Sequence, residues 1–293
     1  LAAIDTRTGK VKNWNPSPNF PVTSITVAGS TVFVGGRFTH INGQPRQHLA
    51  AIDKSTGQLK PWKVDFNSPV ESLAVDGKTL YVGGSFTTAN KIWKQGLVAV
   101  NIDTAAVSNW APQIVGTVYC IIPRDDLVYV GGFIHSIGMQ VGNKHLLAIS
   151  KKTGQQNWWD PQVEGPVLSM VMDEKKLYIA GFFTKISGLD RNHLASFELQ
   201  TGLLYSWNPG ADGIVTSLAK EGDILYVGGT VRQLDGEERK NIGAIDLATG
   251  KATSWNPSVE IMIDSLLVKN SALYIGGSFQ KIDDQEFENL AVF

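Results

Sequence analysis

The side chains that could do chemistry in this sequence are few, and the most suggestive are three histidines and two carboxylates. His48, His145 and His193 could hold a metal ion together, because imidazole is a common metal ligand. Glu71 and Asp264 could act as a general acid and base if their carboxyl groups lay roughly 5 to 9.5 Å apart. Whether the members of either set meet depends on the elements that carry them.

Three sequence markers recur along the whole chain with one period. The second glycine of a VGG element falls at Gly36, Gly84, Gly132, Gly181, Gly229 and Gly277. A tryptophan falls at Trp14, Trp62, Trp110, Trp158, Trp207 and Trp255. An apolar LAAI phase falls at Ala2, Ala50, Val98, Leu147, Ala195, Gly243 and Ala291. Successive markers are about 48 residues apart, so the chain is an array of repeats.

Within one repeat the pattern is β throughout. Residues 22–27, 31–38, 49–53 and 58–62 are short runs rich in β-branched and aromatic residues, separated by AGS, NGQPR and KSTG turns. No stretch of a dozen residues shows helical spacing of apolar positions. Four strands in about 48 residues lie between the periods of the known propeller repeats. The repeat is therefore predicted to be one four-stranded propeller blade.

The repeats predict an all-β chain that forms a single six-bladed β-propeller domain over residues 1–293. The blades are expected at about 22–62, 70–110, 118–158, 167–207, 215–255 and 263–293. The sixth lacks its last strand, which residues 10–14 would supply, so that the chain ends latch the ring and remove exposed sheet edges. Because the first and last residues both occupy the LAAI phase, seven blades are the alternative.

The repeated residues have structural explanations. Paired glycines inside a strand permit a bulge or a close backbone approach, and no helix follows them as a phosphate loop would require. Asp5, Asp53 and Asp246 in AID-x-x-TG are expected to accept backbone N–H groups across a turn. The tryptophan is expected to pack between adjacent blades.

The element LYVGGSF…G…R…LAAID…TG…W.P resembles the bacterial delta-sixty repeat type of β-propeller, over essentially the whole chain. AIDKSTGQLKPW also looks like the tryptophan-docking repeat of quinoproteins, with one extra residue before the tryptophan. The first resemblance implies an extracellular or cell-surface location in a larger exported protein. Quinoprotein dehydrogenases use eight blades and often a vicinal cysteine pair, which this sequence with its lone Cys120 does not match.

Composition excludes several classes of partner. The net charge is −1, and 26 Lys and Arg are dispersed among 27 Asp and Glu, which argues against a nucleic-acid surface. No apolar run reaches the roughly 18 to 20 residues that span a bilayer, so membrane insertion is not expected. Cys120 alone forms neither an internal disulfide nor a cysteine zinc site. Because the chain opens on Leu1 in mid-pattern, we interpret it as an excerpt or a processed product.

The loops divide between two faces of the predicted ring. Tight turns such as AGST and KSTG share one face, whereas the longer segments THINGQPRQH and NPSPNFP share the other, which we call the long-loop face. Binding residues usually lie on long loops, so this face is the candidate site. His48, His145 and His193 occupy one phase in separate blades, so they are expected to cap loops rather than share a metal. Arg46, Arg191 and Arg239 likewise share a phase and are expected to brace their loops.

The second residue of each first strand varies from blade to blade. This position holds Thr23, Glu71, Tyr119, Leu168, Thr216 and Asp264, and it precedes a nearly constant serine. Variation beside constancy suggests side chains that are free of packing and available to a ligand. Thr23, Glu71, Tyr119, Thr216 and Asp264 are therefore candidate binding residues, and Glu71 with Asp264 is the alternative catalytic pair.

Two tryptophans break the repeat. Trp93 has no counterpart in other blades, and Trp159 doubles Trp158. An exposed indole could stack on a sugar or anchor a protein, although Trp159 could equally fill a gap in the core.

The first hypothesis is a non-catalytic extracellular binding or scaffold module that presents its long-loop face to a glycan or a protein, beside other domains of a parent protein. No cofactor, metal or catalytic residue is expected in that case. The alternatives are a polysaccharide hydrolase or lyase at the channel mouth, using Glu71 and Asp264 with Tyr119, and, less favoured, a quinoprotein-like oxidoreductase. Fold alone does not choose between them.

Overall fold

A computed structural model describes residues 1–293, and all of its helix or strand elements are β-strands. The chain forms two compact units, residues 1–158 and 159–293. The boundary falls between two sequence repeats, so no repeat is divided. The repeats are numbered 1 to 6 in chain order below, with repeats 1 to 3 in the first unit and 4 to 6 in the second. None of the elements is a helix that could cross a membrane.

Each repeat folds into an antiparallel sheet whose three main strands follow one another in chain order, and the sheets of repeats 3 and 5 have a short fourth strand. The first strands are β1 (Val22–Ala28), β6 (Val70–Asp76), β11 (Ile114–Arg124), β15 (Val167–Met172), β20 (Val215–Glu221) and β26 (Ile263–Lys269). The second strands are β2 (Thr31–Gly36), β7 (Thr79–Gly84), β12 (Leu127–Ile137), β16 (Lys176–Gly181), β21 (Ile224–Gly229) and β27 (Ala272–Gly277). The third strands are β5 (Leu49–Asp53), β10 (Leu97–Asn101), β14 (Leu146–Ser150), β19 (Leu194–Glu198), β24 (Ile242–Asp246) and β30 (Leu290–Val292).

The expected fourth strand is reduced to a single bridge in repeats 1 to 4, as in Ile52 with Leu59, and only repeat 5 has a regular fourth strand, β25 (Lys251–Ala252). A regular fourth strand at the place predicted from the sequence therefore forms in repeat 5 only. Beyond this bridge the tryptophan of repeat 1 reaches into the next repeat, where Nε1 of Trp62 donates to the carbonyl of Asn101 at 3.2 Å.

A second departure from the prediction is a small hairpin inside the loop between the second and third strands. The hairpins are β3 (His40–Ile41) with β4 (Gln44–Pro45), β8 (Thr88–Ala89) with β9 (Ile92–Trp93), β17 (Lys185–Ile186) with β18 (Leu189–Asp190), β22 (Gln233–Leu234) with β23 (Glu237–Glu238), and β28 (Lys281–Ile282) with β29 (Gln285–Glu286). In repeat 3, β13 (Gln140–Val141) pairs with the end of β12. In the five hairpins outside repeat 3, both turn residues have positive φ, as at Asn42 (51°) and Gly43 (73°), which is the geometry of a type I′ hairpin.

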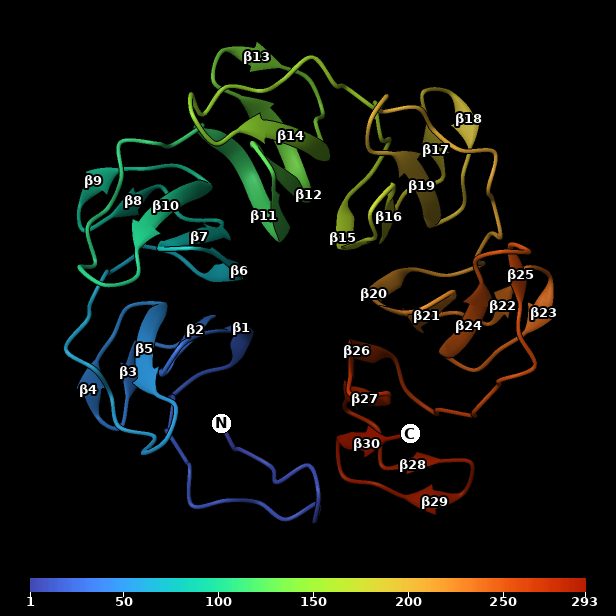
Figure 1. Ribbon diagram of the computed structural model, residues 1–293, viewed down its shortest axis with the longest axis horizontal. Helices are drawn as coiled ribbons and strands as arrows, with labels where there is room; N and C mark the ends of the chain where they lie inside the picture. Colours follow the sequence, from blue (N-terminus) through green and yellow to red (C-terminus); the bar gives the residue numbers. More distant parts are fainter. The chain divides into compact units, whose positions relative to one another are not determined.

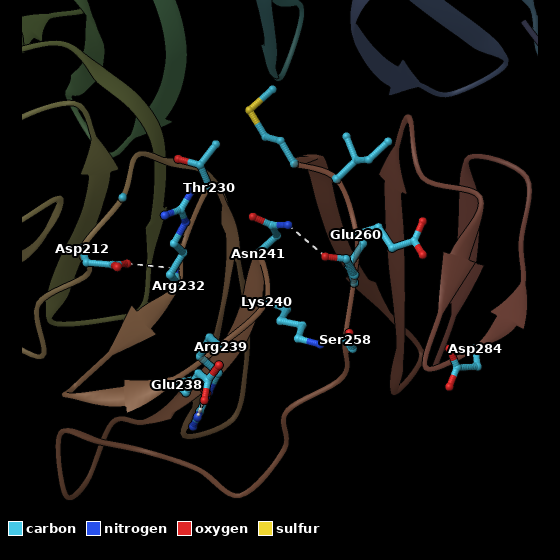
Figure 2. Close-up of a pocket in the computed structure, with 14 residues that line it drawn as sticks. Asp212, Thr230, Arg232, Glu238, Arg239, Lys240, Asn241, Ser258, Glu260 and Asp284 are labelled. Atoms are coloured by element: carbon cyan, nitrogen blue, oxygen red, sulfur yellow. Dashed lines mark hydrogen bonds between the residues drawn. The ribbon is translucent and has the colours of Figure 1, made fainter.

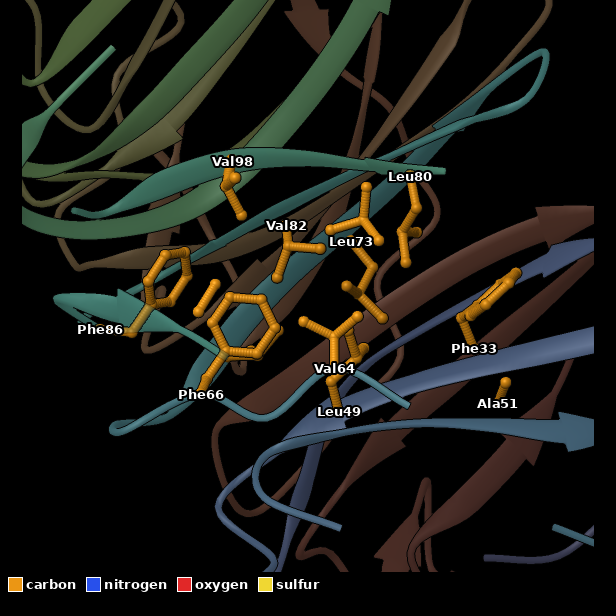
Figure 3. Packing of buried hydrophobic residues seen from close by; sticks show 13 residues of the cluster. Phe33, Leu49, Ala51, Val64, Phe66, Leu73, Leu80, Val82, Phe86 and Val98 are labelled. Carbon is orange, nitrogen blue, oxygen red and sulfur yellow. The ribbon is translucent and has the colours of Figure 1, made fainter. Parts of the chain in front are cut away.

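The hydrophobic core lies between the faces of neighbouring sheets within each unit. Figure 3 shows the layer between repeats 1 and 2, where Phe33 and Leu49 of one sheet face Leu73 and Val82 of the next. The second strand has a sheet neighbour on either side and covered faces, so it reads as a continuous apolar run; five of the six residues of β2 are buried. In Figure 1 the three sheets of the blue-to-green unit follow one another in chain order.

In repeats 1 to 5 the second glycine of the VGG element is required by a close backbone approach. A Cβ on Gly84 would collide with the carbonyl oxygen of Pro69, and one on Gly36 would collide with that of Pro21. This confirms the structural interpretation of the paired glycines.

Residues 1–14 form the second half of one more repeat. Ile4 pairs with Val11 as Ile52 pairs with Leu59, and Nε1 of Trp14 donates to the carbonyl of Asp53 at 3.0 Å. The N-terminal segment thus packs on repeat 1 by the same contact that joins repeat 1 to repeat 2.

Candidate functional site

Two kinds of long loop meet on one face of each unit. The segment that leads into each first strand pairs with the small hairpin of the same repeat, as in Phe66 with Ala89 and Ala211 with Leu234. The tight turns meet on the opposite face, where Lys54 N donates to Ser30 O at 2.9 Å. The predicted grouping of loops into a long-loop face and a tight-turn face is confirmed within each unit.

The long-loop face of the second unit contains an open cleft of about 1060 Å³ between repeats 5 and 6. One wall comes from the loop before β20, the start of the repeat 5 hairpin loop and residues 238–241. The other wall comes from residues 258–262 and from Asp284 in the repeat 6 hairpin. Figure 2 shows these walls with their charged side chains.

Hydrogen bonds fix the backbone of both walls. Asn241 Nδ2 donates to the carbonyl of Val259 at 2.8 Å, which joins the two walls; a dashed line from Asn241 marks this bond in Figure 2. Asp212 Oδ1 accepts the N–H groups of Arg232 and Gln233, each at 2.8 Å. Loops held in this way can present side chains with little loss of conformational entropy on binding.

The side chains that remain exposed in the cleft carry charges of both signs. The cations are Arg232 and Lys240, and the acids are Glu238, Glu260 and Asp284. None of the five takes part in an ion pair within the chain. The rim adds two exposed aliphatic side chains, Ile261 and Met262, which are 46% and 38% exposed. This arrangement suits a partner with polar, charged and apolar groups.

The buried arginine beside the cleft is part of the scaffold. Arg239 donates through Nη1 to Glu238 O at 2.7 Å and through Nη2 to Thr253 O at 2.6 Å. Arg46 and Arg191 make the equivalent bonds to their own repeats. The expectation that these arginines brace their loops is confirmed.

The variable position in the first strands is a β-bulge in every repeat. The register shifts across Thr23, Glu71, Tyr119, Leu168, Thr216 and Asp264. A bulge leaves one residue outside the ladder, which frees its side chain from the sheet pattern.

Two of the candidate bulge residues are not free for a ligand, which corrects the expectation for them. The hydroxyl of Thr23 donates to Val70 O at 2.6 Å, and that of Thr216 donates to Ile263 O. Each therefore ties its repeat to the next one. The following serine has a matching role: Ser24 Oγ accepts the Leu73 N–H at 3.0 Å, and Ser217 Oγ accepts that of Leu266 at 2.9 Å.

The remaining bulge residues have different surroundings. Glu71 is largely buried and pairs with Arg37 of repeat 1 at 3.5 Å, whereas Tyr119 and Asp264 are exposed. Glu71 belongs to the first unit and Asp264 to the second. Neither unit by itself therefore contains the proposed carboxylate pair.

Of the adjacent tryptophans Trp158 and Trp159, the buried one is not the one that the repeat spacing indicated. Trp159 is only 6% exposed, packs edge-on to Phe197 at 5.1 Å and donates from Nε1 to Gly202 O at 2.8 Å, whereas Trp158 is 73% exposed. Trp159 thus makes the docking contact that we assigned to Trp158, and its ring is not available to a ligand. Trp93, by contrast, is 59% exposed on β9, as expected.

The three histidines lie on separate repeats and do not form a metal site. No group of three or more His, Cys, Asp or Glu side chains is arranged to hold a metal ion. His48 and His193 have φ of 68° and 64°, and each Nδ1 bonds the carbonyl of its VGG-element glycine, Gly36 or Gly181, at 3.1 Å. Burial lowers the pKa of His48, His145 and His193. The expectation of loop caps is confirmed for His48 and His193.

The remaining titratable groups of the repeat also have structural roles. The N–H of Arg7 lowers the pKa of Asp5 and that of Thr249 lowers the pKa of Asp246, while the Ser55 hydroxyl makes the largest contribution to the low pKa of Asp53. These bonds confirm the predicted turns. Burial raises the pKa of the Cys120 thiol, which opposes its use as a nucleophile.

No protein-family profile and no curated protein matches the sequence, whereas solved structures do. The chain is similar to BamB from Moraxella catarrhalis, a β-propeller, with 15% identity and a TM-score of 0.54 over 92% of this chain and 82% of that one. The fold is that of a β-propeller.

Two other structures support the fold. One is the computationally designed Ika8 protein, with 13% identity, a TM-score of 0.56 and coverage of 89% of this chain and 82% of that one. The other is the extracellular domain of BT4673 from B. thetaiotaomicron, assigned as a one component system, with 15% identity and a TM-score of 0.59. That alignment covers 94% of this propeller but 32% of the other chain. At such low identities the likeness shows the fold alone.

Sequence reasoning missed the residues of the cleft. One signal was present: before the first strand, repeats 1, 2 and 4 read NFP, NSP and EGP, whereas repeat 5 reads DGI at 212–214 and repeat 6 reads EIM at 260–262. Replacing a proline by an exposed aliphatic side chain is a departure from the repeat on the long-loop face.

Proposed function

We propose that this chain is an extracellular, non-catalytic binding module of the β-propeller class, and that the cleft between repeats 5 and 6 receives a protein partner. The observation that carries the proposal is the cleft itself. Its walls are fixed by hydrogen bonds such as Asn241 to Val259, and they present five unpaired charges beside Ile261 and Met262. Rigid walls with exposed charged and aliphatic groups are typical of a surface that recognises another protein.

A protein partner is favoured over a glycan by the kind of side chain that lines the cleft. Sugar rings stack on aromatic side chains, whereas this lining is charged, polar and aliphatic. Charges of both signs can pair with complementary charges on a protein and set its orientation. A glycan is the alternative ligand of the long-loop face.

The wider proposal is a single domain of six blades, with seven as the alternative, of the delta-sixty-repeat type, within an exported parent protein. The constant period of about 48 residues supports it, as does the likeness to a domain described as extracellular. Blades counted in electron-microscopy class averages would test the ring size.

The test of the cleft is capture of a partner by the immobilised chain from an extracellular protein fraction, followed by identification and titration of that partner. The double variant Arg232→Glu with Lys240→Glu is expected to weaken the affinity at least about tenfold, and added salt is expected to weaken the wild type. Lys54→Glu, an exposed change on the tight-turn face, is the control. Equal affinity of all three proteins, or retention of glycans alone on an array, would contradict the proposal.

A further inference from the structure

The hairpin of repeat 2 borders a small open pocket on the long-loop face of the first unit. This repeat 2 pocket has a volume of about 310 Å³ and is lined by Asp65, Phe66, Asn67, Thr88, Asn90 and Lys91. Ligand sites commonly measure about 300–1,000 Å³, so the repeat 2 pocket suits a small ligand. A protein partner would cover about 800 Å² of surface, which is more than one hairpin provides.

The pairing of three short segments places a tryptophan beside this pocket. Phe66 bridges Ala89 of β8, and both side chains face the core because they are 2% and 0% exposed. On the next strand, β9, Trp93 lies directly opposite Thr88 of β8. Successive residues of a strand point to opposite sides, and directly opposite residues share a side with Cβ atoms about 4.5–5.5 Å apart. Thr88 and Trp93 therefore lie next to each other on the outer side.

The indole of Trp93 is available to a ligand. Its side chain is 59% exposed and makes no hydrogen bond, ring stack or cation–π contact within the chain. The residues at the same place in repeats 1, 3, 4, 5 and 6 are Pro45, Val141, Asp190, Glu238 and Glu286. Packing of a blade therefore does not require an aromatic ring at this place.

The turn of the same hairpin holds a second departure from the repeat. Lys91 has φ of 65°, a left-handed conformation that favours glycine, and Gly43, Gly188 and Gly236 occupy this place in repeats 1, 4 and 5. In repeat 6 the place is taken by Asp284, which lines the cleft of the second unit. A charged side chain thus replaces glycine at this turn only where a pocket adjoins it. Strained backbone of this kind often marks a functional position.

The polar groups of the repeat 2 pocket divide into two sets. One set holds the backbone: Asn67 Oδ1 accepts the N–H groups of Thr87 and Thr88 at 2.9 Å, and Asp65 pairs with Lys63 at 2.9 Å. The other set makes no bond within the chain and consists of the Thr88 hydroxyl, the Asn90 side-chain NH₂ and the Lys91 ammonium. Because Asp65 lines the same pocket as Lys91, the charge of the pocket selects neither an anion nor a cation.

We propose that the repeat 2 pocket and Trp93 form a binding site for a neutral sugar ring of a glycan. The C–H groups on one face of a sugar ring can stack on an indole, while the ring hydroxyls both donate and accept hydrogen bonds. A ring stacked on Trp93 lies within reach of the Thr88 hydroxyl, which can also donate and accept, and Asn90 and Lys91 add donors. The site shares no residue with the cleft of the second unit, which the proposed function assigns to a protein.

The experiment is a screen of the full chain against neutral hexasaccharides of glucose, mannose, galactose and N-acetylglucosamine, beside a heparin hexasaccharide, with calorimetric titration of those that bind. At least one neutral hexasaccharide is expected to bind, with an affinity that added salt leaves unchanged. Trp93→Glu is expected to weaken its affinity at least about tenfold, because the stacking surface is lost. Lys91→Gly is expected to weaken it at least about twofold, because one donor is lost.

Both variants carry residues that other repeats have at these places, so the hairpin backbone should accept them. Trp158→Glu is the matched control, because it replaces another exposed tryptophan of the first unit, 73% exposed, by the same residue. Its sugar affinity is expected to equal that of the wild type. Should Trp93→Glu melt at a lower temperature, the change in tryptophan fluorescence on adding the sugar provides the test, since it is expected in the wild type and not in Trp93→Phe.

Four results would overturn the proposal: no neutral hexasaccharide bound, equal affinity of Trp93→Glu and the wild type, binding of heparin alone that salt abolishes, or a fluorescence change that persists in Trp93→Phe. The cleft variant Arg232→Glu with Lys240→Glu is expected to retain sugar binding, and Trp93→Glu is expected to retain capture of the protein partner. This proposal and the proposed function therefore fail independently.

Discussion

The indole Nε1 of Trp62 in repeat 1 donates a hydrogen bond of 3.2 Å to the backbone carbonyl of Asn101 in repeat 2. Trp110 makes the same contact with Ser150 of repeat 3 at 2.9 Å. Each tryptophan also packs on an aromatic side chain of its own second strand, at 5.0 Å for Phe33 with Trp62. The ring of the tryptophan therefore packs on its own sheet, while its N–H ties that sheet to the next one.

Trp62→Phe should lower the free energy of unfolding of the first unit by about 1–3 kcal/mol, because it removes part of a packed ring and one of the two donors to the Asn101 carbonyl, which keeps the Ala105 N–H. Denaturant unfolding followed by circular dichroism measures the loss. Trp93→Phe, a change at an exposed indole, is the control and should stay within about 0.5 kcal/mol of the wild type. A Trp62→Phe protein as stable as the control would show that the bond is energetically unimportant.

The adjacent pair Trp158 and Trp159 should respond to mutation very differently. Trp159→Ala removes a buried ring and the donor to Gly202, so a loss of about 3–5 kcal/mol is expected. Trp158→Ala should cost less than about 0.5 kcal/mol, since that ring is mostly in solvent. Thermal and denaturant unfolding of the two variants side by side decides the matter, and a reversed order would restore the assignment made from sequence spacing.

The parts of the fold that local patterns govern were predictable from the sequence. Asp53 and Gly57 mark a turn because a short carboxylate bonds nearby N–H groups and glycine adopts positive φ at little cost. Gly84 marks a close backbone approach for a similar reason. These effects act within a few residues or at a fixed offset in each repeat, so a periodic sequence reveals them.

Features that depend on how neighbouring repeats meet were not predictable. Which of Trp158 and Trp159 docks depends on the path of the chain between repeats, which a spacing rule cannot specify. The hydroxyl of Thr23 bonds the carbonyl of Val70, 47 residues further along. The variation of this position between repeats therefore did not mean that the side chain was available to a ligand. The cleft likewise needs the loops of two repeats, from Asp212 to Asp284, to be placed together.

Two glycines of the repeated element provide a matched test of the close approach. In Gly84→Ala the new Cβ would meet the Pro69 carbonyl oxygen, which belongs to the backbone and cannot move aside without shifting the strand. We expect a loss of at least about 1–3 kcal/mol, typical of overpacking. Gly276→Ala is the control, because its nearest neighbours would be Ser265 atoms at 3.8 Å, an ordinary contact. Equal melting temperatures would contradict the steric explanation.

The buried histidines should make the protein less stable in mild acid. Burial lowers the folded-state pKa of His48 and His193 below the unfolded value of about 6.5, although the bonds to Gly36 and Gly181 and the charges of Glu71 and Asp212 partly oppose this shift. The unfolded chain then binds more protons than the folded one. Stability is therefore complete above about pH 6.5 and falls as the pH drops toward the folded-state pKa, by at most about 1.4 kcal/mol per pH unit for each histidine.

The variant His48→Asn with His193→Asn should flatten this pH dependence without unfolding the protein at neutral pH. Asparagine already occupies the equivalent left-handed positions at Asn241 and Asn289, with φ of 68° and 65°, so the backbone should accept it. Melting temperatures measured between about pH 7.5 and pH 5 would show a steep fall for the wild type and a shallow one for the variant. Parallel curves for the two proteins would assign the acid sensitivity to other groups, and a variant that melts far lower at neutral pH would show that the imidazole bonds contribute stability that asparagine does not replace.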